Sequence, residues 1–133
     1  MKRALALCVV LLAGCGGPAG DLFEVERSGA DRAANITLVV SDDGFVTCDG
    51  AKKELPPDLL LRARQLARDM SVQAELNLTL PAGADPVLSY KARMGAGTIS
   101  FSDTSRPLPK SFTELTVYTK DVAERVCGVS RRG

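Results

Sequence analysis

Alternating apolar and polar positions predict most of the secondary structure of this chain. Such alternation is typical of strands with one buried face, and short β-rich runs between turn residues are typical of strands as well. Glycine-containing segments, Asp42-Asp43-Gly44 and Gly95-Ala96-Gly97, are each predicted to turn the chain back into a hairpin. The predicted strands are residues 22–27, 35–41, 45–48, 87–94 and 98–103.

A first helix is predicted to open at Leu55-Pro56-Pro57-Asp58. Proline is tolerated at the first helical position, and an acid in the first turn suits the helix dipole. Residues 71–80 fit both a helical stripe and a strand, so periodicity leaves this segment ambiguous. We expect helix to about Ala74 and an extended segment from there to Pro81. The predicted buried stripe is Leu59, Ala63, Leu66, Ala67 and Met70.

A second helix is predicted near the end of the chain. Ser111 and Glu114 have the spacing of a capping box at its start, and Gly128 is predicted to end it. Together the segments predict an α+β domain with an antiparallel sheet of four to five strands. Both helices are expected on one face of the sheet, which leaves the other face partly wet. The predicted stripe of the second helix is Phe112, Leu115, Thr119, Val122 and Val126.

The two hairpin–helix units also match each other at a shift of 53 residues. Gly44 then aligns with Gly97, and Leu55-Pro56 aligns with Leu108-Pro109. Two readings stay open at this point. The match reflects either a ββα duplication or the turn glycines and apolar positions that any two such units share.

The start of the chain resembles a secretory leader. Lys2 and Arg3 precede an apolar run from Ala4 to Ala13, which has half the length of about 20 residues that a spanning helix needs. Leu12-Ala13-Gly14-Cys15 resembles the lipobox of bacterial lipoproteins, rather than an ordinary A-x-A cleavage site. That resemblance implies lipid attachment at Cys15 and cleavage before it. The expected organisation is a signal peptide at residues 1–14, a tether at 15–21, one domain at 22–128 and a tail at 129–133.

The cysteines then divide into three roles. Cys8 leaves with the leader, and Cys15 carries the lipid, so Cys48 and Cys127 remain. In an oxidising compartment a disulfide between them is the expectation, and it would close a loop of about 80 residues. Two free thiols or half of a metal site are the alternatives. Cys48 and Val46 share a face of their strand, and if that face carries the helices, the disulfide would join the sheet to the helix layer.

Composition excludes several function classes. Without its leader the chain has a net charge of −1, which does not favour a nucleic-acid binder. The chain contains no histidine, the commonest general base and metal ligand, so we expect no enzyme activity, no cofactor and no metal site. Asp42, Asp43 and Asp49 lack EF-hand spacing and are interpreted as turn residues. Basic residues gather in one region, where they form a solvated helix face or contact anionic headgroups: Lys52, Lys53, Arg62, Arg64 and Arg68.

Three features of the chain occur in the same order in a known family: the string from Phe23 to Gly29, the helix start Glu54-Leu55-Pro56-Pro57, and a later hairpin marked by Tyr90, Gly97, Phe101 and Asp103. Through them, most of residues 22–124 resemble emfourin, a family of small bacterial inhibitors of thermolysin-like metalloproteases. The resemblance implies a fold of this type and an inhibitory function. The lipobox, the cysteine pair and the C-terminal extension of this chain depart from the family.

Two functions follow as hypotheses. The first is a lipid-anchored, non-enzymatic binding domain on the extracytoplasmic side of the cell membrane or outer membrane. It would be held to the membrane by the lipid on Cys15, and its partner would be a protein or an envelope component. The second is a membrane-tethered inhibitor whose partner is a thermolysin-like protease. The sheet edges are the first candidate binding surfaces, because their backbone groups are unpaired.

Overall fold

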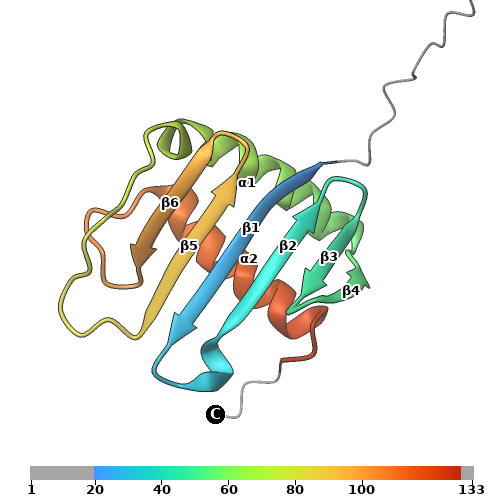
Figure 1. Ribbon diagram of the computed structural model, residues 1–133, viewed down its shortest axis with the longest axis horizontal. Coiled ribbons are helices and arrows are strands. Elements are labelled where there is room, and N and C mark those ends of the chain that lie inside the picture. Colours follow the sequence, from blue (N-terminus) through green and yellow to red (C-terminus); the bar gives the residue numbers. More distant parts are fainter. Residues whose placement is uncertain (1–19, 130–133) are drawn as a thin grey trace, which may run out of the picture.

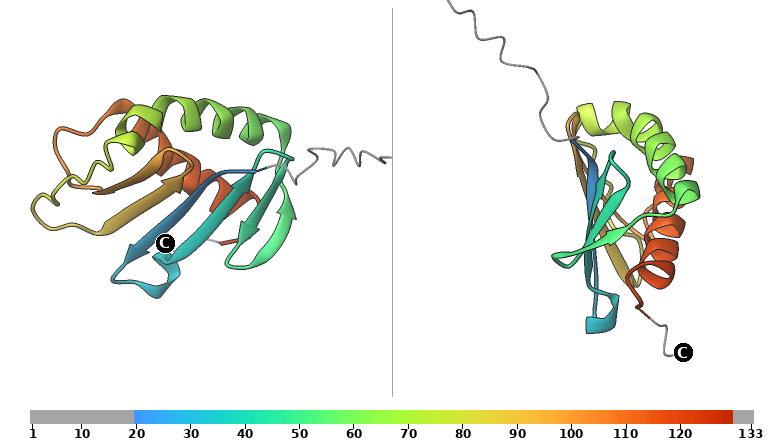
Figure 2. Two further views of the ribbon diagram at one scale, coloured as in Figure 1. Left: turned by 45° about the horizontal axis from the view of Figure 1, so that its top comes forward. Right: turned by 90° about the vertical axis from the view of Figure 1, so that its right-hand side faces the viewer.

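A computed structural model describes residues 20–129. The chain forms one six-stranded antiparallel sheet in the order β4-β3-β2-β1-β5-β6. Both long helices cover the same face of this sheet, and the other face is open, as Figures 1 and 2 show. The predicted α+β architecture with both helices on one face is therefore confirmed. The elements are β1 (Asp21–Gly29), η1 (Arg32–Ala34), β2 (Ile36–Ser41), β3 (Phe45–Cys48), β4 (Ala51–Glu54), α1 (Pro57–Glu75), β5 (Leu88–Met94), β6 (Gly97–Ser102) and α2 (Lys110–Arg125).

The sheet has one strand more than the largest predicted number. The additional strand is β4, whose four residues Ala51–Glu54 are all exposed and therefore show no alternation. It forms because the turn at Asp49-Gly50 brings it back onto β3, where Cys48 faces Ala51 and Val46 faces Lys53. The prediction of four to five strands was wrong on this point. Backbone pairing with β3 makes β4 a strand, and burial of its side chains plays no part.

The core lies between the sheet and the helices and follows the predicted alternation. In α1 the buried stripe contains Ala74 in place of the predicted Ala67, which is only half-buried. Tyr118 is fully buried and makes an edge-to-face contact with Phe23, with ring centroids 5.9 Å apart. Its hydroxyl has no hydrogen-bond partner within residues 20–129, and burial raises its pKa. The remaining aromatic contacts are the stacked rings of Tyr90, Phe101 and Phe112.

The two helices run antiparallel and are joined by ion pairs across their interface. Arg62 lies 2.7 Å from Asp121, and Arg125 lies 3.0 Å from Asp58. These ion pairs place the start of α1 beside the end of α2. The hydrogen bonds from Arg125 lower the pKa of the Asp58 carboxyl.

The predicted capping box at the start of α2 is wrong. The helix begins at Lys110 after the cap residue Pro109, and no side chain caps it. Ser111 is therefore already inside the helix, where it is buried, and Glu114 pairs with Lys110 at 3.3 Å instead. The backbone of Pro109, with φ −55° and ψ 145°, sets the helix start.

The ambiguous segment after α1 resolves as expected. The helix ends at Glu75, and the chain then runs extended along the outer side of β6. The amide of Ser100 donates to the carbonyl of Leu78, and the amide of Leu80 donates to the carbonyl of Ser100. This segment therefore covers the edge of the sheet at β6.

The match at a shift of 53 residues extends to the helix starts but not to the handedness of the units. Pro56 and Pro109 are equivalent cap residues with nearly identical backbone angles. However, β2 and β5 both run antiparallel to β1 on its opposite sides, and their hairpin partners lie farther out. With both helices on one face, the two units have opposite hands, which no rotation superposes (Figure 1). The arrangement argues against a simple tandem duplication.

The β5–β6 hairpin approaches α1 closely at Gly97. A Cβ atom there would lie 2.0 Å from the carbonyl oxygen of Ala74, and the φ angle of +151° also disfavours a side chain. We expect Gly97→Ala to lower the free energy of unfolding by about 1–3 kcal/mol, the usual range for overpacking. Urea unfolding followed by circular dichroism measures this change.

Gly95 provides a matched control in the same turn. A Cβ atom there would meet nothing within 4 Å. Gly95→Ala should leave the unfolding midpoint nearly unchanged. Equal effects of the two substitutions would contradict the close approach of Gly97 to α1.

Candidate functional site

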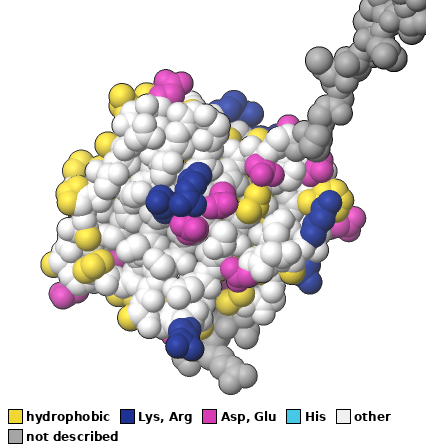
Figure 3. All heavy atoms as spheres, viewed as in Figure 1, with side chains coloured by type: hydrophobic (Ala, Val, Ile, Leu, Met, Phe, Trp, Pro, Cys, Tyr) yellow, Lys and Arg dark blue, Asp and Glu magenta, His cyan; other side chains and the backbone are white. Residues whose placement is uncertain are grey.

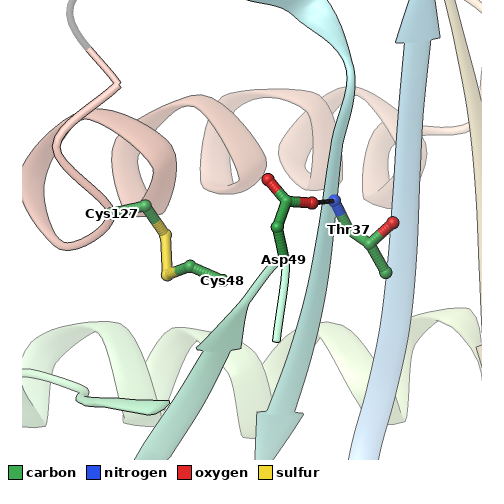
Figure 4. The surroundings of a disulfide bond; sticks show 4 residues. All are labelled: Thr37, Cys48, Asp49 and Cys127. Carbon is green, nitrogen blue, oxygen red and sulfur yellow. Dashed lines mark hydrogen bonds between the residues drawn. A yellow bond between two sulfur atoms is a disulfide. The ribbon is translucent and has the colours of Figure 1, made fainter. Parts of the chain in front are cut away.

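The predicted disulfide joins the sheet to the helix layer. Cys48 is the last residue of β3, and Cys127 follows the end of α2 (Figure 4). Their sulfur atoms are bonded at 2.03 Å, with the Cα atoms 5.8 Å apart. Next to the disulfide, the carboxylate of Asp49 accepts a hydrogen bond from the amide of Thr37 at 2.8 Å. Asp49 therefore holds the turn after β3 against β2.

The predicted lipidation residue Cys15 and the leader before it lie outside the described residues. Within residues 20–129, no helix has the length and the apolar composition that crossing a membrane requires. Gly20, the first described residue, lies beside the β2–β3 turn, because its carbonyl accepts a hydrogen bond from the amide of Asp42. The chain thus enters the domain at this end of the sheet, which we call the proximal end.

The predicted basic region does not form one patch. Arg62 pairs with Asp121, and Arg64 lies 2.6 Å from the carboxylate of Asp42. Lys52 and Lys53 belong to β4 instead of α1, and Lys52 lies over the ring of Phe45 at 4.0 Å. The positive charge of the predicted basic region is therefore partly compensated by neighbouring acids, and it is divided between α1 and β4.

Two of the three acidic turn residues, Asp42 and Asp49, contact other protein groups. Asp42 binds Arg64, and Asp49 binds the backbone of Thr37. Within the described part of the chain, no group of three or more His, Cys, Asp or Glu side chains is placed to hold a metal ion.

The two sheet edges differ in exposure. The β6 edge is covered by the segment around Thr79, as described above. The β4 edge is exposed and carries Lys52 and Lys53. Lysine on an edge strand disfavours pairing with a further strand, so neither edge offers a ready surface for strand addition.

A concave surface lies at the distal end of the sheet, opposite Gly20. It is a groove of about 560 Å³ on the open face, and we call it the open-face groove. Two cross-strand rows of side chains form its floor. The first row is Ser28, Ser89 and Ser102, and the second row is Thr37, Glu26, Lys91 and Ser100.

The walls of the groove come from segments on either side of the sheet. Leu80 and Ala82 of the segment after α1 line one side, and Asn35 and Asp49 line the other. The floor is rich in hydroxyl groups, which both donate and accept hydrogen bonds. Ser102 is held in place by hydrogen bonds with Ser105 and Thr104. The groove is therefore suited to a partner with many polar groups.

A charged cluster borders the groove on the open face. Arg93 lies 2.6 Å from Glu24 and 3.4 Å from Glu26, and these contacts raise its pKa. Figure 3 shows charged side chains of both signs together near the middle of this face, with mainly uncharged surface around them. Charge on this face is thus nearly balanced beside the groove.

Sequence reasoning did not predict the groove. Its floor consists of the polar half of the alternating pattern, which is the signal that marks an open sheet face but not a binding site. The chain matches no protein-family model, no curated protein and no solved structure. The functional conclusion therefore rests on geometry and chemistry.

Proposed function

We propose that this protein is a lipid-anchored, non-enzymatic binding domain on the extracytoplasmic side of a bacterial membrane. The lipid would be carried by Cys15, and a protein or an envelope component would bind in the open-face groove. The membrane would be the cell membrane or the outer membrane. The position of the groove relative to the start of the domain is the observation that carries this proposal.

The groove and the chain entry lie at opposite ends of the sheet. Gly20 precedes β1, and Ser28 in the groove is near the end of the same nine-residue strand. At about 3.3 Å per residue, β1 separates the two by roughly 25–30 Å. A domain held to the bilayer through Cys15 would therefore present the groove away from the membrane.

The disulfide supports an extracytoplasmic location. Disulfides persist in oxidising compartments and are rare in the cytosol. The Cys48–Cys127 bond also closes one end of the helix layer over the sheet, so the sheet is held as a rigid platform for the groove. A rigid surface loses little conformational entropy when a partner binds.

A photo-reactive amino acid at Ser89 tests this proposal in native membranes. Ser89 is exposed in the floor of the groove, so we expect the full chain to cross-link to a defined partner from this position. The matched control is Thr98, which lies on the same face outside the groove and should give less than about a tenth of the yield. Mass spectrometry of the cross-linked product identifies the partner.

A second substitution distinguishes specific binding from proximity. Ser28 is exposed and lies directly across from Ser89, so Ser28→Arg should fill the groove and abolish the cross-link. Thr98→Arg adds the same charge outside the groove and should retain it. A cross-link that survives at full yield in Ser28→Arg, or equal yields from Ser89 and Thr98, would reject the groove as the binding site.

The alternative function is a membrane-tethered inhibitor of a thermolysin-like metalloprotease. One feature of the structure favours it beside the resemblance to emfourin. The loop between α1 and β5 is exposed from Pro81 to Val87, yet the hydroxyl of Ser105 donates to the carbonyl of Pro81 at 2.9 Å. An exposed loop that is anchored by a hydrogen bond to the body of the domain is suited to enter a protease cleft. Stoichiometric inhibition of a thermolysin-like protease by the full chain would favour this alternative.

A further inference from the structure

A second concave site lies at the distal end, between the sheet and α2. It is a pocket of about 570 Å³, and we call it the helix-side pocket. It shares Arg27 and Tyr90 with the open-face groove but opens on the helix side of the sheet. Its lining residues combine three cations, one acid, and apolar and hydroxyl side chains: Arg27, Arg106, Lys120, Asp103, Tyr90, Leu88, Leu108, Val117, Thr113 and Thr116.

The two arginines are fixed by backbone carbonyls rather than by acids. The Nε atom of Arg27 donates to the carbonyl of Ala34 at 2.7 Å. An Nη atom of Arg106 donates to the carbonyls of Asp103 and Ser105, at 3.1 and 2.6 Å. A guanidinium has five N–H donors, so each arginine is positioned while most of its donors remain for a ligand.

The positive charge of the pocket is not neutralised locally. Within residues 20–129, Arg27, Arg106 and Lys120 have no carboxylate within 4 Å, whereas Arg62, Arg64, Arg93, Lys110 and Arg125 each have at least one. The single acid of the pocket is Asp103, whose carboxylate accepts a hydrogen bond from the amide of Val87 at 3.1 Å. Three cations and one acid leave the pocket with an excess of two positive charges.

Beside its cations, the pocket has an apolar wall, which favours a ligand with an apolar part. Leu88, Leu108, Val117 and the ring of Tyr90 line the pocket beside the cations. Burial raises the pKa of the Tyr90 hydroxyl, and the charges of Arg27 and Asp103 act on it in opposite directions. The volume of the pocket lies within the range of small-molecule sites, which combine an apolar wall with a few polar groups.

We propose that the helix-side pocket binds a small organic anion, with a carboxylate or phosphate group between Arg27 and Arg106 and an apolar body against Leu88, Leu108 and Val117. Planar guanidinium groups pair with the oxygens of both kinds of anion through charge-assisted hydrogen bonds. This site opens on the opposite face of the sheet from the open-face groove and does not depend on the identity of the partner there.

Calorimetric titration of the full chain, purified in an uncharged detergent, tests the proposal. The probes are benzoate, phenyl phosphate and the uncharged analogue benzamide. We expect at least one of the two anions to bind at least about tenfold more tightly than benzamide, because charge-assisted hydrogen bonds form only with the anion. Tighter binding of benzoate identifies a carboxylate site, and tighter binding of phenyl phosphate identifies a phosphate site.

Charge-matched variants assign the binding to this pocket. Arg106 is exposed, so Arg106→Gln should fold normally and weaken binding of the preferred anion by about tenfold or more. Arg68→Gln removes the same charge from an exposed position on α1 outside the pocket, and it should leave the affinity within about twofold. Arg27→Lys keeps the charge but loses the planar fork, so an intermediate affinity is expected.

Three results would overturn the proposal. They are equal binding of benzamide and the anions, equal weakening by Arg68→Gln and Arg106→Gln, and no heat of binding from either anion at millimolar concentration. Circular dichroism of each variant, recorded before titration, separates loss of binding from loss of fold.

Discussion

Replacing Cys48 and Cys127 together by alanine is expected to lower the free energy of unfolding by about 4–5 kcal/mol. The disulfide spans 79 residues of sequence, and the loss of chain entropy in the unfolded state grows with the length of the closed loop. Domains of this size have a total stability of about 5–15 kcal/mol, so the double variant should be marginally stable. Urea unfolding of the oxidised protein and the double variant, with circular dichroism as the signal, measures the difference.

Reduction provides the control for this experiment. A thiol reductant should shift the unfolding midpoint of the wild-type protein towards that of the double variant and leave the double variant unchanged. Because Cys127 follows α2, the last turn of that helix should lose hydrogen-exchange protection first when the bond is broken. A loss of less than about 1 kcal/mol would show that the bond adds little beyond the packing of α2.

Cys15→Ala is expected to abolish acylation of this protein completely. In the proposed lipobox Leu12-Ala13-Gly14-Cys15, the lipid would be carried by Cys15, so without this cysteine the chain should carry no lipid and retain residues 1–14. Metabolic labelling with a radioactive fatty acid and intact mass measurement test both effects. The wild-type protein should instead remain with the membrane fraction, since two or more acyl chains anchor stably.

Cys8→Ala is the matched control for this prediction. Cys8 lies within the expected leader, so its substitution should leave the fatty-acid label and the mature mass unchanged. Persistence of the label in Cys15→Ala, or an unmodified wild-type protein that starts at another residue, would remove the basis for a lipid anchor.

The sequence predicted the sheet well where burial and alternation coincide. Phe23 and Val25 in β1, and Leu38 and Val40 in β2, are all buried on the helix side. Burial of every second side chain imposes a period of two on the sequence, so such strands can be read directly. The exposed strand β4 leaves no such imprint, and it was missed for that reason.

The start of α2 was predicted less well than the helix interiors. The stripe of α1 around Leu59, Ala63 and Met70 was correct because the core requires it. The start of α2 was not, because local residue spacing suggested a cap at Ser111 while the backbone at Pro109 begins the helix earlier.

By itself, the sequence determined the α+β class, the strand residues that face the core, and the cysteines available for a disulfide. These follow from local periodicity and from the number of cysteines. Only the tertiary structure decided which polar residues come together. Strand pairing places Ser28 next to Ser89, and the loop after β6 brings Arg106 to the same pocket as Arg27. Polar residues on an open face impose no packing constraint, so their spatial grouping leaves no periodic signal along the chain.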